Sequence, residues 1–306
     1  MLDVSAAHRI AVATSAESPG INADDELLVR YLAESSVATQ PVLWNDGAAD
    51  WSAFDAVLIH TTWDYHEQYT RFLGWLAHLE ALRVPTINPS RMLRWNSDKR
   101  YLLELPPLGI AIIPTQVAHA GELRDVLARL RGEAVVVKPT VSGSAWNTVR
   151  GIAGTEELDN AVAKLPQHLA YLVQPFVPEV AREGEWSLLF FGGAYSHAVC
   201  KRPANDDYRV QREFGGSVDI VAPPPEALEA ARHAVSAVAT MCAQRDFGRI
   251  SYARIDGVRS GGRFLLMEIE LIEPFLFLGG APQASRSFAE EIAREIKAAA
   301  RSAPSA

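Results

Sequence analysis

Cysteine is scarce in this 306-residue chain, which contains only Cys200 and Cys242. Two cysteines do not make a disulfide framework or a zinc site, so a reducing cytoplasm is the expected location. Long apolar runs are also lacking, because no stretch approaches the roughly eighteen apolar residues of a membrane span. The first residues lack the basic and then apolar segments of a signal peptide. We therefore expect a cytoplasmic protein with no membrane partner.

An excess of positive charge is lacking as well. The chain has 29 Lys and Arg against 37 Asp and Glu, for a formal net charge of −8. Phosphate backbones demand a basic surface, so no nucleic-acid partner is expected. The sequence contains no Walker A loop, GxSxG elbow or GxGxxG loop, which leaves P-loop, α/β-hydrolase and Rossmann functions without support.

Short apolar runs alternate with helical segments in the first third of the chain. RIAVATS, PVLW and FDAVLIH are predicted strands, and residues 26–33 and FLGWLAHLEAL are predicted helices. This alternation predicts an α/β protein with a parallel sheet. Ligands of such sheets bind beyond the carboxyl ends of the strands. The candidates at the end of FDAVLIH are His60, Thr62, Trp63, Asp64 and Tyr65.

The most informative segment is an acidic hairpin, SYARIDGVRSGGRFLLMEIELIEP. Side chains two residues apart on a strand share a face, so Glu268 and Glu270 do. If the turn centres near Gly261, that face also holds Asp256 and Arg254. Buried carboxylates need a counter-charge, and magnesium that carries nucleotide phosphates is a common one. A shift of the turn by one residue would break this arrangement.

Two weaker patterns precede the hairpin. Lys138 ends the apolar run AVVVKP before a Gly/Ser loop at 142–144, whose N–H groups suit phosphate oxygens. A solvated lysine followed by an ordinary turn is the alternative. In LVQPFVPEV, a strand flanked by Gln174 and Glu179 runs into Val-Pro. It is either a hinge that pairs with an adenine edge or a plain connector.

A basic strand lies in the same lobe as the acidic hairpin. SHAVCKRP places Lys201 on one face and Arg202 on the other, and Arg209 follows in the next segment. A solvated edge strand is the alternative, since edge lysines are common. The acidic hairpin favours the functional interpretation, because phosphate needs cations and its magnesium needs carboxylates.

Together these segments resemble the ATP-grasp superfamily over nearly the full chain. The order of motifs is Lys99 in NSDKRYL, Lys138, the Gly/Ser loop, LVQPFV and the C-terminal acids. TTWDY, RWNSDKRYL, EGEWSLLFFGGAYSHAVCKRP, YRVQREFGGS and MEIELIEPFLFL are most similar to the cycloserine synthetase branch, the O-ureidoserine cyclo-ligases, which are related to glutathione-synthetase-like and RimK-like ligases. The chain departs in two places: His60 stands where we expect a basic residue, and Glu270 where most ATP-grasp enzymes carry Asn.

The resemblance implies an ATP-grasp fold of three domains, all of mixed α/β composition. They are a pre-ATP-grasp parallel-sheet domain (1–98), a small central lid domain (99–177) and a C-terminal mixed-sheet domain with a metal site (178–306). It also implies ATP and two Mg2+ ions as cofactors. ATP-grasp ligases of this size are often dimers, so a homodimer is expected.

The resemblance further implies a role for each site residue. Lys99 and Lys138 would hold phosphates, Ser142, Gly143 and Ser144 would cover the γ-phosphate, Gln174, Phe176 and Val177 would bind adenine, and Glu179 or Glu185 the ribose. Asp256, Glu268 and Glu270 would coordinate magnesium, while Lys201, Arg202 and Arg209 would neutralise the transferring phosphoryl group. We separately expect substrate contacts from Arg254, which is also a candidate catalytic residue, and from His60, Thr62, Trp63, Asp64, Tyr65 and Glu273.

The implied activity is ligation of carbon to nitrogen through an acylphosphate. The substrate would be a small amino-acid-like carboxylate of the O-ureidoserine type, which closes on itself. An intermolecular ligase that joins two amino acids, or an amino acid and an amine, is the first alternative. A phosphotransferase and a non-catalytic nucleotide-binding module are the others. The intact set of three acids and two lysines disfavours the last.

Overall fold

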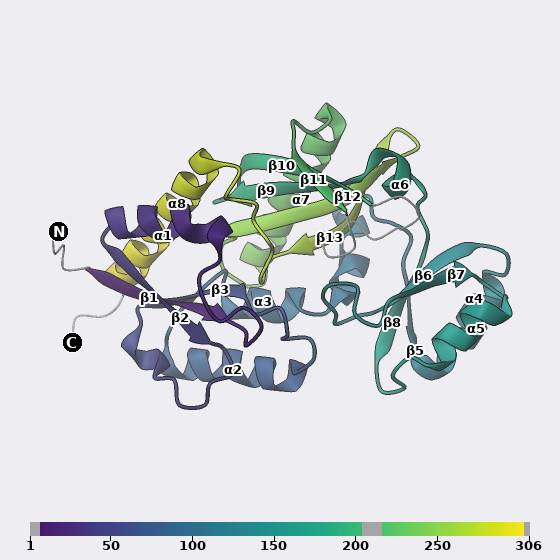
Figure 1. The fold of residues 1–306 in the computed structure, drawn as a ribbon, viewed down its shortest axis with the longest axis horizontal. Helices are drawn as coiled ribbons and strands as arrows, with labels where there is room; N and C mark the ends of the chain where they lie inside the picture. Colours follow the sequence, from purple (N-terminus) through teal and green to yellow (C-terminus); the bar gives the residue numbers. More distant parts are fainter. Residues whose placement is uncertain (1–6, 204–215, 303–306) are drawn as a thin grey trace.

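Three β-sheets organise the chain in the computed structural model, which describes residues 7–203 and 216–302 (Figure 1). The N-terminal sheet is parallel, with strand order β2-β1-β3-β4. Its elements are β1 (His8–Thr14), α1 (Glu26–Glu34), β2 (Val37–Leu43), β3 (Ala56–Thr61), α2 (Tyr69–Leu82), β4 (Thr86–Ile87) and α3 (Ser90–Asn96). The predicted alternation of strands and helices is therefore confirmed.

Neighbouring residues of β1 explain why helices cover both faces of this sheet. Ile10 packs with Leu28 of α1 and Phe288 of α8 (Pro282–Ser302). Ala11 faces the opposite way, toward Phe72 of α2. Figure 1 shows α1 and α8 side by side above the sheet and α2 below it. The last helix of the chain thus completes the N-terminal lobe.

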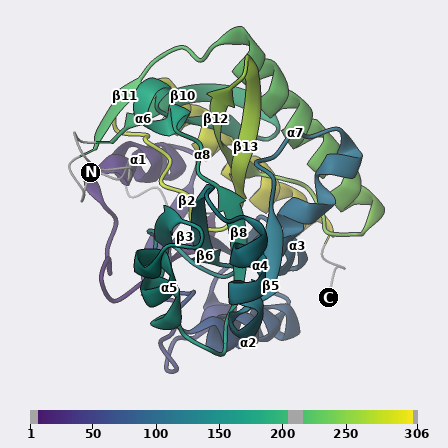
Figure 2. The ribbon, with the colours of Figure 1, turned by 90° about the vertical axis from the view of Figure 1, so that its right-hand side faces the viewer.

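A smaller antiparallel sheet, β5-β8-β6-β7, forms the central lobe. Its elements are β5 (Gln116–His119), α4 (Leu123–Arg129), β6 (Ala134–Pro139), β7 (Val149–Ile152), α5 (Glu156–Ala163) and β8 (Ala170–Pro175). Helix α5 begins where the Thr155 hydroxyl accepts a hydrogen bond from Leu158 N. In Figure 2 this lobe faces the viewer, below the C-terminal sheet. The domain boundaries at 98 and 177 stay a prediction.

The C-terminal sheet has the order β11-β10-β9-β12-β13. Its elements are α6 (Glu179–Glu183), β9 (Glu185–Phe191), β10 (Ala194–Arg202), β11 (Ser217–Ile220), α7 (Pro225–Gln244), β12 (Tyr252–Ser260) and β13 (Arg263–Glu270). All of its ladders in the described part of the chain are antiparallel. An isolated parallel bridge joins Ile112 to Leu266 of β13.

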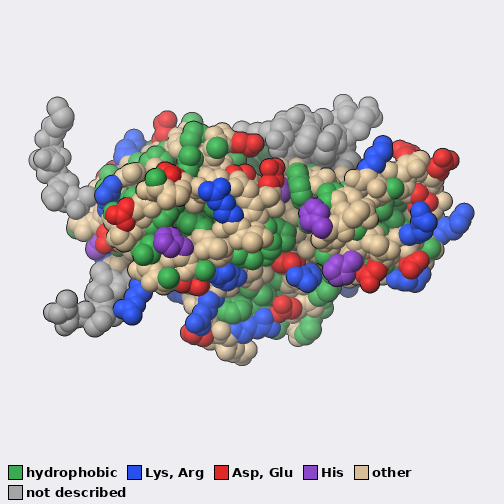
Figure 3. Space-filling view, turned by 90° about the horizontal axis from the view of Figure 1, so that it is seen from below, with side chains coloured by type: hydrophobic (Ala, Val, Ile, Leu, Met, Phe, Trp, Pro, Cys, Tyr) green, Lys and Arg blue, Asp and Glu red, His purple; other side chains and the backbone are tan. Residues whose placement is uncertain are grey.

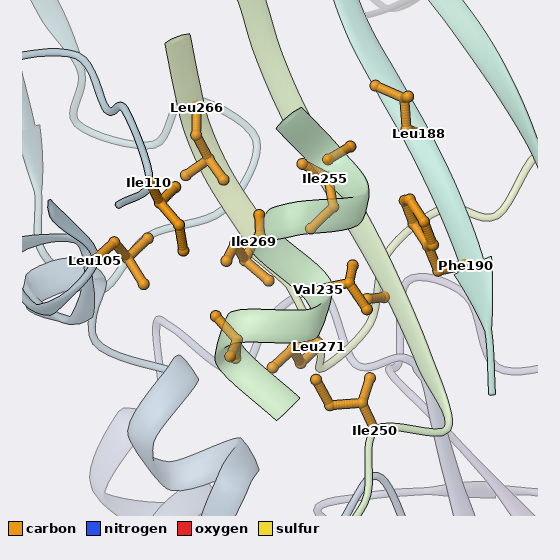
Figure 4. Packing of buried hydrophobic residues seen from close by; sticks show 14 of the residues in the cluster. Leu105, Ile110, Leu188, Phe190, Val235, Ile250, Ile255, Leu266, Ile269 and Leu271 are labelled. Atoms are coloured by element: carbon orange, nitrogen blue, oxygen red, sulfur yellow. The ribbon is translucent and has the colours of Figure 1, made fainter. Parts of the chain in front are cut away.

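Helix α7 covers one face of the C-terminal sheet. Figure 4 shows Val235 of α7 against Ile255 of β12 and Ile269 of β13, with Leu188 and Phe190 of β9 nearby. These side chains are buried in one apolar cluster. Because residues alternate between faces along a strand, the neighbours of Ile255 and Ile269 point to the opposite face. That opposite face carries the acidic residues of the hairpin.

Side chains from the N-terminal half of the chain satisfy the outer edge of β13. The buried Asn96 amide donates to Ile269 O (2.7 Å) and accepts from Leu271 N (2.9 Å). The Tyr101 hydroxyl donates to Ile269 O (2.9 Å). Asp98 caps the 3-10 helix Lys99–Glu104 by accepting a hydrogen bond from Arg100 N. An exposed row of unpaired backbone groups is thereby avoided.

The surface is mixed in charge. On the face drawn in Figure 3, acidic and basic side chains are interspersed. Over residues 7–203 and 216–302, no helix combines the length and the apolar character needed to cross a membrane.

Asn88 joins the N-terminal and C-terminal lobes, and its loss should destabilise the protein. Its buried amide donates to Tyr252 O and Leu271 O (2.8 Å each) and accepts from Ser251 N (2.7 Å). Its backbone is left-handed (φ 62°), which Asn tolerates better than Ala. We predict that Asn88→Ala lowers the free energy of unfolding by about 2–4 kcal/mol in urea titrations.

The matched control is Asn160→Ala, at an exposed position of α5. It should change the free energy of unfolding by no more than about 0.5 kcal/mol. Equal effects of the two substitutions would contradict the role given to Asn88.

Candidate active site

A cavity of about 910 Å³ is lined by residues of all three lobes. This volume lies at the upper end of the range for small-molecule sites, about 300–1,000 Å³. The predicted site residues that line it are Trp63, Asp64, Tyr65, Lys99, Lys138, Ser142, Gly143, Ser144, Gln174, Phe176, Val177, Glu185, Lys201, Arg254, Asp256, Glu268, Glu270 and Glu273. Segments far apart in the sequence therefore line one cavity, and the sequence analysis had assigned them to one site.

Several predicted residues do not line this cavity. Arg202 points to the other face of β10 and forms an exposed ion pair with Asp219 (3.0 Å). His60 is buried against the Asp25 carboxylate (2.6 Å). Thr62 is fully buried, and Glu179 begins helix α6. Arg209 lies outside the described residues.

The hairpin of β12 and β13 brings the acids together. Gly261 and Gly262 both have positive φ, as a two-residue hairpin turn requires, and Ser260 pairs with Arg263. Continued regularly, this register would pair Asp256 with Met267. A register shift between Asp256 and Gly257 instead places Asp256 opposite Glu268. The shift puts all the hairpin acids on one face.

Arg254 neutralises two of these acids. Its guanidinium contacts Asp256 Oδ2 (2.8 Å) and forms an ion pair with Glu270, which is the residue opposite it in the ladder. Burial raises the pKa of the Asp256 carboxyl, but Arg254 and Lys201 outweigh burial and lower it to about 2. Asp256 is therefore ionised at neutral pH.

Glu270 behaves in the opposite way. Burial raises the pKa of its carboxyl, Arg254 lowers it, and repulsion from Asp256 and Glu268 raises it again, to about 7. One guanidinium therefore does not balance the carboxylates packed around it.

Two lysines from the central part of the chain approach the acids. Lys99 Nζ lies 2.9 Å from Glu268 Oε1 and donates to Ser142 O (2.6 Å). Burial lowers the pKa of Lys99, but Glu268 raises it above its ordinary value. Lys138 lines the cavity without an ion-pair partner among the described residues, and burial lowers its pKa. A phosphate would give Lys138 a charge partner.

Lys201 comes from β10, next to the hairpin. It forms an ion pair with Glu185, and its Nζ lies 3.9 Å from Asp256 Oδ1. Glu185 and Lys201 pair directly across the β9–β10 ladder. The alternation predicted for SHAVCKRP thus separates Lys201, inside the cavity, from Arg202, outside it.

The donor set fits magnesium in its chemistry. In the described parts of the chain, no group of three or more acid, histidine or cysteine side chains is arranged to hold a metal ion. The Glu268 carboxylate instead faces Lys99. The Asp256 carboxylate faces Arg254 and Lys201. Carboxylate oxygens are the ligands that Mg2+ prefers, and the raised pKa of Glu270 marks an excess of acid. The residues Asp256, Glu268 and Glu270 stay the predicted ligands.

One end of the cavity is set by β8, which carries Gln174. The Gln174 amide donates to the Thr115 hydroxyl (2.8 Å), which fixes the orientation of this buried side chain. The guanidinium of Arg150 lies 3.6 Å from the centre of the Phe176 ring. Val177 packs in a small apolar cluster with Ile113. These groups form an apolar wall beside one oriented amide.

The sequence analysis did not single out His66, which contacts the Gly/Ser loop. Its ring packs edge-on against Trp146 (5.2 Å between centroids), and a Cβ on Gly143 would lie 3.3 Å from its Nδ1. Burial lowers the pKa of His66. Ser144 and Ala145 have left-handed backbones, a strained state that is common at functional loops. The position of His66 directly after TTWDY was the available signal.

Phe275 and Phe277 were also missed by the sequence analysis. The Phe275 ring lies 6.5 Å from Trp63 and 4.9 Å from Phe277, and all three line the cavity. Trp63 Nε1 donates to Glu273 O (3.2 Å), which joins the TTWDY loop to the segment after β13. The available signal was the run EPFLFL, whose aromatics directly follow a predicted site residue.

The raised pKa of Glu270 predicts a pH dependence of stability. The folded protein keeps a proton on Glu270 up to about pH 7, whereas the unfolded chain loses it near its ordinary value of 4.5. Stability of the ligand-free protein should therefore fall as pH rises through this window. We predict that Glu270→Gln, measured by urea unfolding in EDTA at pH 5 and pH 8, loses less stability than the wild type over this interval.

The control for this prediction is Glu157→Gln, at an exposed position of α5. It should keep the wild-type pH dependence. Identical pH profiles for wild type and Glu270→Gln would show that Glu270 titrates normally.

The chain is similar to known proteins over nearly its full length. The family described as "D-cycloserine synthetase DcsG, N-terminal domain" matches residues 10–88. The cycloserine biosynthesis protein DcsG of Streptomyces lavendulae is 31% identical over 309 residues, which cover 94% of this chain and 99% of that protein. The similarity therefore extends through all three sheets.

Solved structures give the same result. The crystal structure of D-cycloserine synthetase DcsG superposes with a TM-score of 0.83 at 29% identity, covering 94% of this chain and 99% of that one. D-alanine–D-alanine ligase from Bacillus anthracis superposes with a TM-score of 0.64 at 18% identity, covering 96% and 99%. A RimK domain ATP-grasp protein from Sphaerobacter thermophilus gives 0.66 at 16% identity, covering 92% and 98%. The last two are similar in fold.

Proposed function

Because the chain belongs to the D-cycloserine synthetase family of ATP-grasp ligases, we propose that it closes the ring of an O-ureidoserine-type substrate in an ATP-dependent reaction. The proposal is carried by one observation. Acids on the β12–β13 hairpin, Lys99 and Lys138 of the central part of the chain, and the Gly/Ser loop all line the same cavity. These are the groups that a phosphoryl transfer to a carboxylate needs.

The chemistry solves a leaving-group problem. A carboxylate is a poor acyl donor because its oxygen leaves badly. One carboxylate oxygen of the substrate attacks the γ-phosphorus of ATP, ADP leaves, and an acylphosphate forms. A nitrogen of the same substrate then attacks the carbonyl carbon and loses its proton, and phosphate leaves. The protein contributes positioning and charge neutralisation.

The cations of the cavity would carry out the neutralisation. Lys99 and Lys138 would bind the phosphates of the nucleotide, with Gln174 at its adenine. Lys201 and Arg254 would lie against the phosphoryl group in transit. Two Mg2+ ions bound by Asp256, Glu268 and Glu270 would neutralise phosphate charge. Carboxylates that are now paired with Arg254 and Lys99 would exchange these partners for the metal.

The loop at 142–146 would protect the acylphosphate from water. Such an intermediate hydrolyses readily, so the site must close around it. His66 and Trp146 already hold this loop against the N-terminal lobe. From the family resemblance, we also propose that the chain folds into three domains and forms a homodimer.

The proposed function predicts ADP release with a single substrate. Purified protein with Mg-ATP should release ADP and phosphate when given one enantiomer of O-ureidoserine alone, measured by coupled assay over a panel of single and paired amino acids. Release only with a second amine would identify an intermolecular ligase instead. A stable phosphorylated product without free phosphate would identify a phosphotransferase.

Glu268 should be required for turnover. Its carboxylate contacts Lys99 and lies directly across the hairpin from Asp256. We predict that Glu268→Gln lowers kcat by at least about a thousandfold, because one ligand charge next to the phosphates is lost. Circular dichroism should show an intact fold.

The control is Glu104→Gln, which removes a glutamate from an ion pair with Arg245 outside the cavity. It should keep most of the activity. A folded, fully active Glu268→Gln protein would refute the assignment of the metal site.

A further inference from the structure

Among the residues that the structure describes, Glu273 differs from the acids of the hairpin because it has no cationic partner. Asp256 and Glu270 pair with Arg254, and Glu268 pairs with Lys99. No described residue forms an ion pair or a hydrogen bond with the Glu273 carboxylate, although this side chain is half-buried and lines the cavity. Lys99 and Arg254, the cations that act on its pKa, are already paired with other acids. A half-buried carboxylate without a partner would be stabilised by a cation from outside the protein.

The backbone around Glu273 is held from two sides. Trp63 Nε1 of the N-terminal lobe donates to Glu273 O (3.2 Å). Arg254 Nη1 of β12 donates to Phe275 O (3.1 Å). Pro274, between these two anchors, fixes its own φ. The unpaired carboxylate is therefore presented from a rigid segment and not from a free loop.

Aromatic rings flank the same part of the cavity. Trp63 and Phe275 lie 6.5 Å apart, and Phe275 meets Phe277 edge-on at 4.9 Å. Aromatic faces attract cations and exclude water from them. Burial raises the pKa of Glu273 well above its ordinary range, and repulsion from Glu270 adds to this. A bound ammonium would relieve both effects.

The cavity thus offers cations together with one carboxylate that pairs with no described cation. Lys99, Lys138, Lys201 and Arg254 supply positive charge for phosphates and for a carboxylate. Glu273, with Trp63 and Phe275, offers negative charge and apolar surface at the segment that follows β13. A small molecule that carries an ammonium next to a carboxylate matches these charges, with its carboxylate toward the cations.

We propose that Glu273 binds the α-ammonium group of the substrate, and that it thereby selects α-amino carboxylates over carboxylates that lack the amine. The inference rests on the proposed function for the identity of the substrate. It makes Glu273 a determinant of specificity whose partner is the substrate and not a metal ion. The aromatic wall of Trp63 and Phe275 completes the subsite.

The test compares two ligands that differ only in the amine. They are O-ureidoserine and 3-(carbamoylaminooxy)propanoate, its deaminated analogue. Dissociation constants are measured by calorimetry with Mg2+ and a non-hydrolysable ATP analogue, so that no turnover is needed. The wild type should bind the amine-bearing ligand about 10- to 100-fold more tightly, the effect of one charge-assisted contact.

Glu273→Gln should reduce this ratio to within about threefold, because a neutral amide loses the charge interaction. Its affinity for the nucleotide should be unchanged, and Glu273→Asp should recover part of the ratio. Glu17→Gln is the matched control, because Glu17 is an exposed carboxylate at the same cavity. It should keep the wild-type ratio.

Three outcomes would overturn the inference. They are a wild type that binds neither ligand or does not distinguish them, a full preference in Glu273→Gln, and a preference lost in Glu17→Gln instead. ADP release is measured separately on the same proteins. If the wild type shows the binding preference but releases no ADP, the inference about Glu273 stands and the proposed ligase function fails.

Discussion

The ion pairs of Arg254 are the interaction on which the cavity depends. This buried guanidinium holds Asp256 and Glu270 on neighbouring strands and also binds Phe275 O of the following segment. A buried carboxylate without such a partner would be neutralised or would destabilise the fold. Arg254 therefore allows several acids to share one face of the C-terminal sheet. The remaining excess of acid is visible in Glu270, whose pKa is raised to about 7.

The acids on that face keep their positions in the cavity because β13 is held in place. The strand lies at an edge of its sheet, and its outer backbone groups are bound by Asn96 and Tyr101. Asn88 binds the backbone of both Tyr252 and Leu271. These contacts come from the segment between the N-terminal sheet and the central lobe. The polar residues that stabilise the domain arrangement thus also fix the position of the acids relative to Lys99.

The sequence by itself determined the chemical class of the site. Alternation along strands required Glu268 and Glu270 to share a face, and the order of lysines, Gly/Ser loop and acids indicated an ATP-grasp ligase. The same rule separated Lys201 from Arg202. The parallel sheet at the N-terminus followed from the alternation of short apolar strands with helices. These features are local or periodic, so backbone geometry alone enforces them.

Only the tertiary structure decided how these groups meet. The Gly261–Gly262 turn alone would pair Asp256 with Met267, and a register shift next to Gly257 restores the pairing with Glu268. No periodic pattern in the sequence predicts such a register shift. His60 was predicted for the site, but a buried partner, Asp25, holds it away from the cavity. Phe275 and His66 enter the cavity through contacts with distant segments. Packing between lobes selects such contacts, and it leaves no regular spacing in the sequence.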